Sequence, residues 1–158
     1  VFGQRPTDVK VLPHQIAFNV VPQVEVFRPE DEGFSTEETK IVEESRKILG
    51  IADLRVVATC ARVPVMNGHS ESVVVETRKP VPVEAARDLL AASPGLEVRD
   101  DPAMGEYPMA LDAAGQDEVL VGRLREDPTV ANGLAFWLVA DNLRKGAALN
   151  AVQIAEAL

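Results

Sequence analysis

Cysteine is almost missing from this chain, and that scarcity limits both its compartment and its chemistry. Cys60 is the only thiol among 158 residues, so no disulfide can form within the chain. Small proteins of oxidising compartments often depend on such bonds, and nothing here indicates that setting. We therefore expect a cytoplasmic protein.

Positive charge and long apolar runs are also scarce. Lys and Arg together number 16 against 25 Asp and Glu, which gives a net charge of −9. Nonspecific nucleic-acid binding needs clustered basic residues, and an anionic membrane surface repels an acidic protein. A membrane-spanning helix needs roughly 20 apolar residues, and no run approaches that length. The composition predicts a soluble protein with neither a nucleic-acid nor a membrane partner.

Two recognisable segments are missing as well. No Gly-x-Gly-x-x-Gly turn follows an expected strand, so a dinucleotide-binding half is not among these residues. Residues 1–6 contain neither an initiator Met nor the apolar core of a signal peptide. The missing Met hints that the chain is a fragment, although processing would look the same.

What the chain does contain is enough apolar sequence for one domain. With 158 residues, 46% of them hydrophobic, it can bury a sizeable core, and a second full domain is not expected. Strands outnumber helices and several follow one another directly. This pattern favours an α+β fold with a mixed, largely antiparallel sheet and helices packed on one face. The expected strands are 16–26, 54–63, 72–78, 96–99, 118–125 and 134–140, and the expected helices are 36–49, 83–92 and 142–157.

The helix over 36–49 has the clearest local signals. Ser35 and Glu38 have the spacing of a capping box, and Gly50 offers a C-terminal stop. Between them, apolar residues recur at helical spacing at Ile41, Val42, Ile48 and Leu49. The sequence therefore predicts both ends of this helix.

Arg62 and His69 are the first candidates for chemistry. They lie seven residues apart at an expected strand-to-strand turn, and sites are often built at such loops. The Arg fork suits a carboxylate or a phosphate, and His exchanges protons near neutral pH. Together they indicate acid/base chemistry on an anionic substrate. The ordinary alternative is a surface charge and a loop histidine, and the pair alone does not decide between the two.

Four segments of the chain resemble aspartate-semialdehyde dehydrogenase, in order and with natural spacing. The resemblance implies the C-terminal catalytic and dimerisation domain of that family, with a glyceraldehyde-3-phosphate-dehydrogenase-like fold. It also implies an NADP-dependent oxidoreductase of lysine (diaminopimelate), methionine and threonine biosynthesis, acting as a homodimer. The four segments are Ile16 to Gln23, Glu44 to Gly50, Ala58 to Val65 with Gly68 to Ser70, and Asp141 to Asn150.

The resemblance implies a reaction and roles for the two candidates. The family interconverts β-aspartyl phosphate and aspartate semialdehyde through a cysteine thioester, with NADP as hydride carrier and phosphate as acyl partner. On this basis His69 is the catalytic acid/base. Arg62 binds the carboxylate of the substrate, for which its planar fork is suited.

Three more residues receive roles by the same resemblance. Glu37 would hold the substrate ammonium group and Lys40 the phosphate, and their spacing of three places them on one helical face. Without the family match, an exposed ion pair is the ordinary explanation. Asn142 would contact NADP, and it is equally a plausible helix-capping residue. No metal is expected.

Cys60 is not expected to be the nucleophile of this family. The family's catalytic cysteine lies in an earlier segment that this chain lacks, together with the substrate-positioning glutamine and the Rossmann half. Cys60 lies in an apolar alternating run, where a free Cys is usually buried and unreactive. The chain alone is therefore expected to be inactive. Two alternatives stay open, a catalytically silent dimerisation module and a small hydrolase that uses Cys60 with His69.

The resemblance also divides the chain. We expect residues 1–140 to form the catalytic and dimerisation domain. Residues 141–158 would form a C-terminal helix that packs on the missing nucleotide-binding domain, and Asp141 is a plausible cap for it.

Overall fold

The computed structural model describes residues 10–158. Its contacts divide the chain into two compact units, the first ending at Pro64 and the second running from Val65 to Leu158. Each unit has its own internal packing and is described by itself.

The first unit is built around one long helix. After a 3-10 turn, η1 (Pro29–Asp31), the helix α1 runs over Thr36–Leu49. Ser35 N donates to Glu38 Oε2 at 2.8 Å, and Glu38 N donates to Ser35 Oγ at 3.3 Å. Gly50 ends the helix in a left-handed conformation at φ 66°. The predicted capping box, helix bounds and stop are confirmed.

The two strands predicted for this unit are wrong. Residues 16–26 and 54–63 contain no regular strand and meet in a single antiparallel bridge between Val21 and Arg62. Val21 N donates to Arg62 O at 3.0 Å, and Arg62 N donates to Val21 O at 2.8 Å. The two segments are therefore joined at one residue pair instead of along a ladder.

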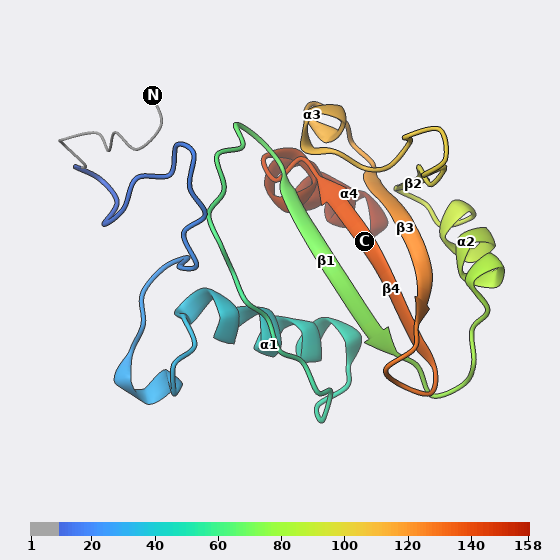
Figure 1. The fold of residues 1–158 in the computed structure, drawn as a ribbon, viewed down its shortest axis with the longest axis horizontal. Coiled ribbons are helices and arrows are strands. Elements are labelled where there is room, and N and C mark those ends of the chain that lie inside the picture. Colours follow the sequence, from blue (N-terminus) through green and yellow to red (C-terminus); the bar gives the residue numbers. More distant parts are fainter. Residues whose placement is uncertain (1–9) are drawn as a thin grey trace. The chain divides into compact units, whose positions relative to one another are not determined.

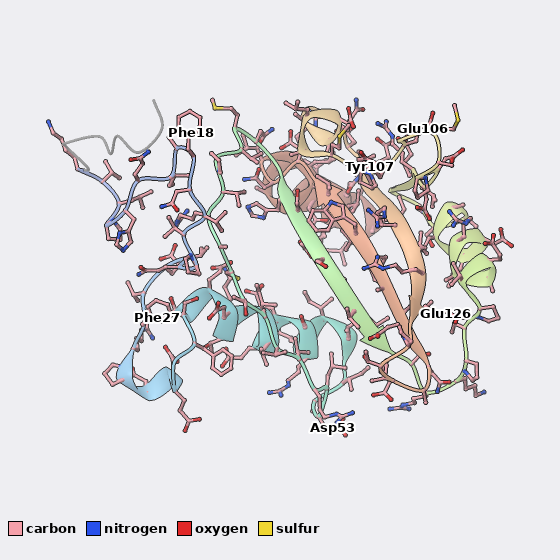
Figure 2. All side chains as sticks on the ribbon, viewed as in Figure 1. Phe18, Phe27, Asp53, Glu106, Tyr107 and Glu126 are labelled. Carbon is pink, nitrogen blue, oxygen red and sulfur yellow. The ribbon has the colours of Figure 1, made fainter. Side chains whose placement is uncertain are left out.

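Local backbone conformation explains why the first ladder does not form. Phe18 and Glu25 are in the left-handed region, at φ 57° and 63°, which interrupts an extended pleat on both sides of Val21. Pro22 has no N–H to donate to a ladder. Alternating apolar residues alone do not bury a segment, since Phe18 is 90% exposed and Val57 is 77% exposed. The Phe18 side chain is labelled in Figure 2.

The second unit is a four-stranded sheet in the order β1-β4-β3-β2 (Figure 1). The strands are β1 (His69–Glu76), β2 (Leu96–Val98), β3 (Val119–Asp127) and β4 (Gly133–Ala140). β4 pairs antiparallel with both β1 and β3, while β2 pairs parallel with β3. The prediction of a mixed, largely antiparallel sheet is confirmed. Its strands lie within a few residues of the expected ranges.

Each face of the sheet has its own apolar cluster. The helix α2 (Val83–Ala91) packs Ala86 against Val121 and Leu134 on one face. On the other face, Ala113 of the four-residue helix α3 (Ala110–Ala113) packs against Leu120 and Val139. The α2 face holds the larger cluster, so most of the core of this unit lies between α2 and the sheet.

A β-bulge in β3 keeps the apolar side chains on the correct face. The pairing register with β4 shifts between Gly122 and Arg125, and Arg123 has φ 57°. The extra residue returns Leu124 to the α2 side, where it joins the core. Asp100 supports the bulge by accepting from Arg123 N at 2.7 Å and Leu124 N at 3.2 Å.

The C-terminal α-helix begins at Leu149 instead of the expected position 142, and a different form of helix precedes it. A π-helical turn, η2 (Arg144–Ala148), precedes the α-helix α4 (Leu149–Ala157). The hydrogen bond from Ala148 N to Leu143 O, at 3.3 Å, spans five residues. The single regular helix predicted for 142–157 is therefore corrected to a π turn followed by a shorter α-helix. In the described part of the chain, no helix is long and apolar enough to cross a membrane.

The bulge generates a stability prediction. Asp100 is 2% exposed and pairs with Arg87 Nη1 at 2.7 Å in addition to its two backbone donors. Asp100→Ala leaves the N–H of buried Leu124 without an acceptor and Arg87 without its buried partner, so we expect a loss of roughly 2–4 kcal/mol. Glu84→Ala removes the exposed partner of the same arginine and should cost no more than about 0.5 kcal/mol. Urea unfolding followed by Trp137 fluorescence measures both, and equal losses would contradict the bulge's dependence on Asp100.

Candidate functional site

The N-terminal turn of α1 places two of the predicted site residues in contact. Lys40 Nζ lies 2.6 Å from Glu37 Oε2, one helical turn apart. This hydrogen bond, followed by the charges of Glu37, Glu44 and Glu25, raises the pKa of Lys40. Lys40 therefore stays positively charged at neutral pH. Its side chain is 50% exposed, so the charge is accessible to an anion.

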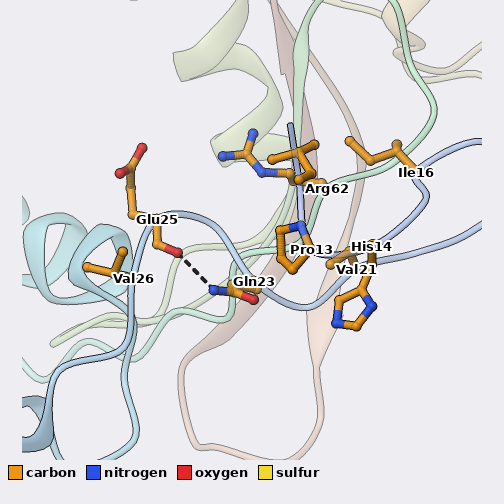
Figure 3. Close-up of a pocket in the computed structure, with 9 residues that line it drawn as sticks. Pro13, His14, Ile16, Val21, Gln23, Glu25, Val26 and Arg62 are labelled. Carbon is orange, nitrogen blue, oxygen red and sulfur yellow. Dashed lines mark hydrogen bonds between the residues drawn. The ribbon is translucent and has the colours of Figure 1, made fainter. Parts of the chain in front are cut away.

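Arg62 lines a hollow of about 210 Å³ in the first unit (Figure 3). The hollow is also lined by Val21, Gln23 and Glu25, with His14 in its wall. Gln23 Nε2 donates to the backbone oxygen of Glu25 at 3.1 Å. Within residues 10–158, the guanidinium of Arg62 makes no side-chain hydrogen bond or ion pair. A half-buried cation facing a hollow, without a partner, is available to bind an anion.

Glu25 connects the hollow to the helix. Its side chain lines the same hollow as Arg62, and its charge also acts on Lys40. The left-handed backbone at Glu25 is uncommon for a residue with a side chain. Sequence patterns did not single out this residue, because it lay inside an expected strand and carries no motif. The first unit thus gathers Arg62, Lys40, Glu37 and Glu25 around one region.

Glu38 fixes the backbone before Arg62 against the start of α1. Its Oε1 accepts from Cys60 N at 2.8 Å, while its Oε2 accepts from Ser35 N at 2.8 Å. Glu38 is 7% exposed, and these backbone donors, Ser35 first and Cys60 second, lower its pKa. The capping residue was predictable from sequence. Its second bond, 22 residues along the chain, was not.

His69 and Asn142 come close together in the second unit. His69 is the exposed first residue of β1 and pairs with Ala140, the last residue of β4. Two residues further, Asn142 accepts from Gly68 N through Oδ1 at 2.9 Å. The predicted acid/base residue and the predicted cofactor contact therefore share one hydrogen-bonded turn.

The residue before Asn142, Asp141, is also hydrogen-bonded to this turn. It is 3% exposed, and its Oδ2 accepts from Asn67 Nδ2 and Gly115 N, both at 2.8 Å. Its Oδ1 accepts from Leu143 N at 2.9 Å and Arg144 N at 3.2 Å, at the residues that lead into the π turn η2. Hydrogen bonds from these donors, that of Gly115 first, lower the pKa of Asp141.

The predicted site residues thus divide between the two units. Arg62, Glu37 and Lys40 belong to the first, and His69 and Asn142 belong to the second. The first group offers charges for binding a small zwitterion or an anion. The second offers an exposed imidazole beside an amide. Among the described residues, no group of three His, Cys, Asp or Glu side chains could hold a metal ion.

The sheet, the helix and this turn define a dimerisation domain of the semialdehyde dehydrogenase class. Residues 2–145 match the family described as "Semialdehyde dehydrogenase, dimerisation domain". The chain belongs to the aspartate-semialdehyde dehydrogenase family, as the resemblance of its motifs predicted.

Two curated relatives show the extent of the similarity. The chain is 49% identical to the aspartate-semialdehyde dehydrogenase of Aquifex aeolicus over 156 residues, which cover 99% of this chain and 45% of the relative. It is 49% identical to that of Bacillus subtilis over 146 residues, with coverages of 92% and 42%. The chain therefore spans less than half the length of these relatives.

Solved structures share the fold. Aspartate semialdehyde dehydrogenase II from Vibrio cholerae, complexed with ASA, superposes with a TM-score of 0.89 at 45% identity, over 96% of this chain and 44% of that chain. The enzyme from Candida albicans, with NADP, gives a TM-score of 0.65 at 26% identity, over 80% and 40%. The predicted fold relationship is confirmed.

Glu38 generates a prediction on acid stability. Because its pKa is lower in the folded chain, its contribution is fully present above the ordinary Glu pKa of about 4.3 and is lost as the pH falls through the lower folded value. Glu38→Gln replaces one acceptor oxygen by a donor, so we expect a loss of roughly 1–3 kcal/mol at pH 7. The difference from wild type should shrink below about pH 4.3.

Urea unfolding followed by circular dichroism at pH 7 and below pH 4 measures both values. Glu43→Gln, an exposed position on the same helix, is the matched control and should have little effect at either pH. A difference for Glu38→Gln that is constant across this range would show that the buried carboxylate does not contribute through its charge.

Proposed function

We propose that this chain is the catalytic and dimerisation part of an NADP-dependent aspartate-semialdehyde dehydrogenase. The full protein would interconvert β-aspartyl phosphate and aspartate semialdehyde, in cytoplasmic lysine, methionine and threonine biosynthesis. The observation that supports this most directly is the unpartnered guanidinium of Arg62 in a hollow shared with Glu25, which in turn acts on Lys40. The region is suited to a small molecule with charged groups of both signs.

The first unit would bind the substrate. The fork of Arg62 matches a carboxylate with two parallel hydrogen bonds. Glu37 is the acceptor for the substrate ammonium group, and Lys40 supplies positive charge to the phosphate. Binding would exchange the Lys40 to Glu37 contact for contacts with the substrate, so neither of these two charges is left unpaired in either state.

The second unit would transfer the proton. His69 is exposed at the start of β1, where its imidazole can receive a proton from a thiol and return it to a tetrahedral intermediate. The nucleophilic cysteine of the family lies outside this chain. Cys60 is half-buried, which is less burial than its apolar run predicted, and we propose that it remains structural in the segment that Glu38 holds through Cys60 N.

The amide of Asn142 fits a contact with NADP. Its Oδ1 is occupied by Gly68 N, while its Nδ2 donates no hydrogen bond within residues 10–158. That donor is free for an oxygen of the cofactor. NADP, when bound, accepts or supplies the hydride. We further propose that residues 141–158 pack on the nucleotide-binding domain of the full protein.

The second candidate role is dimer formation without chemistry, and one face of the sheet supports the dimer in either case. Two apolar strand residues are not available for such a contact, because Leu120 is fully buried and Val75 packs into the α2 core. By contrast, Val74 is 59% exposed and shares its face with Ser72 and Trp137, which are paired across β1 and β4. We propose this β1-β4 face (Ser72, Val74, Trp137) as the contact between two copies.

Substitution at Val74 tests the interface. Val74→Glu in the full-length protein places a charge in the proposed contact, where desolvation opposes association, so sedimentation velocity should show a shift from dimer to monomer. Leu89→Glu is the control, because Leu89 is 67% exposed on α2, outside this face. A dimer that persists with Val74→Glu would mean that another surface joins the copies.

Kinetics of the full-length enzyme test the two roles separately. Arg62→Lys keeps the charge but loses the fork, so the KM for aspartate semialdehyde should rise roughly tenfold to hundredfold. His69→Gln should lower kcat by about 10² to 10⁴ with a smaller change in KM. The reverse pattern, a KM effect for His69 and a kcat effect for Arg62, would contradict the assignment.

The isolated chain provides a further test. With aspartate semialdehyde, phosphate and NADP it should show no turnover, because the nucleophile is elsewhere. Any turnover that Cys60→Ser abolishes would overturn the structural role of Cys60 and favour the hydrolase-like pairing with His69.

A further inference from the structure

Two consecutive residues, Asp141 and Asn142, accept hydrogen bonds from the turn that precedes His69. Asn67 donates through its side chain to Asp141 Oδ2 at 2.8 Å, and Gly68 donates through its backbone to Asn142 Oδ1 at 2.9 Å. These bonds join positions 74 residues apart in the chain. Because both bonds are made by the two residues just before His69, they fix the backbone from which the imidazole projects.

Within residues 10–158, no side-chain hydrogen bond or ion pair orients the imidazole of His69 itself. His69 is exposed, and its ring makes no hydrogen bond with any other described residue. Many catalytic histidines are aligned by a carboxylate on the second ring nitrogen. Here the alignment has to come from the backbone of the turn and from the first pair of β1 with β4, His69 with Ala140.

The backbone of Gly68 leaves little freedom for rearrangement. It has φ 96°, a conformation that side chains disfavour, and a Cβ at this position would lie 3.3 Å from Ala140 O and 3.7 Å from Ala110 Cβ. The turn is thus packed closely against the end of β4. The Asp141 carboxylate also accepts a hydrogen bond from the Asn67 side chain of this turn.

The single carboxylate of Asp141 accepts hydrogen bonds from four donors. Its four donors come from three places, namely Asn67 in the turn, Gly115 after α3, and Leu143 with Arg144 at the start of the C-terminal helix. The described residues place no Lys or Arg side chain in an ion pair with it. Its negative charge is balanced by oriented N–H groups alone.

We propose that Asp141 is a positioning residue for His69. By holding Asn67, and by placing Asn142 under Gly68, it sets where the imidazole stands relative to the incoming thiol. A proton acceptor works within a narrow range of distances, and a displacement of about 1 Å can cost roughly a hundredfold in rate. This inference rests on the proposed role of His69.

Asp141→Asn tests the inference with little change in shape. The Asn oxygen can still cap the helix by accepting from Leu143 and Arg144, since Asn is a good capping residue. Its amide group, however, would face the donors of Asn67 and Gly115 and can accept from neither. The substitution therefore takes the acceptor away from Gly115 N and forces Asn67 to turn its side chain or lose its bond, while Leu143 and Arg144 keep theirs.

The measurement is the pre-steady-state burst of NADPH formation in the full-length enzyme. The burst amplitude reports the fraction of active enzyme, whereas the burst rate constant reports the chemistry of each active site. We expect Asp141→Asn to lower the rate constant by roughly tenfold to hundredfold, with the KM for aspartate semialdehyde unchanged, because the binding residues lie in the other unit. A loss of amplitude at a normal rate constant would overturn the inference, since it would show a purely structural role.

Asn67→Ala is the second variant, for the case that Asp141→Asn does not fold. It removes one donor from a half-buried side chain and leaves Asp141 three others. The rate constant should fall in the same direction by a smaller factor. Asp117→Asn is the control, because it neutralises an exposed acid that pairs with Arg144 beside the same helix, and its rate constant should match wild type. An unchanged rate constant for Asn67→Ala would also overturn the inference.

A spectroscopic measurement separates the two proposals. The ring signal of His69, assigned by its loss in His69→Gln, should shift or broaden in Asp141→Asn when observed by NMR of the full-length enzyme. If His69→Gln leaves the burst rate constant unchanged, the proposed role of His69 fails. If His69→Gln abolishes the burst but neither Asp141 nor Asn67 affects its rate constant or the ring signal, only the positioning inference fails.

Discussion

Buried carboxylates that accept backbone N–H groups hold the irregular parts of this chain in place. Glu38 joins the start of α1 to the segment before Arg62, and Asp141 joins the start of the C-terminal helix to the turn before His69. Asp100 does the same for the bulge in β3. A carboxylate has two oxygens with several acceptor positions, so one side chain can satisfy donors from two or three segments that share no regular structure. The candidate site residues lie on the segments held in this way.

The proposed function separates binding from proton transfer. Charged side chains are gathered in the unit that ends at Pro64, whereas the imidazole of His69 and the amide of Asn142 lie in the unit built on the sheet. Under the proposal, two chemical tasks with different requirements fall to two structural environments. Substrate binding would use long side chains around a hollow, while proton transfer would use a short turn at the end of paired strands.

Local signals in the sequence predicted local structure well. The helix over 36–49 was predictable because Ser35, Glu38 and Gly50 act within a few residues of each other. The strands of the sheet were predictable because they contain short, continuous apolar runs rich in β-branched residues. The segments 16–26 and 54–63 contain β-branched apolar residues as well, yet left-handed residues such as Phe18 and Glu25 stop them from pairing. No sequence pattern signals a left-handed Phe or Glu. The partners of Glu38 and Asp141 were equally invisible, since they lie 22 and 74 residues away in the chain.

The π turn at Arg144–Ala148 has a consequence for how the sequence of the C-terminal helix can change in length. Such a turn holds one residue more than an α-helical turn, and removing that residue would restore regular helical bonding without sacrificing any of it. Because a π turn is wider than an α-helical turn, it takes up the extra residue with little rotation of the helix that follows, so exposed Val152 and Ile154 would keep their direction after that deletion. A one-residue deletion within α4 itself would instead rotate every following side chain by about 100° around the helix axis. The π turn is therefore the point at which the end of the chain accepts a change of length without changing the surface that it presents.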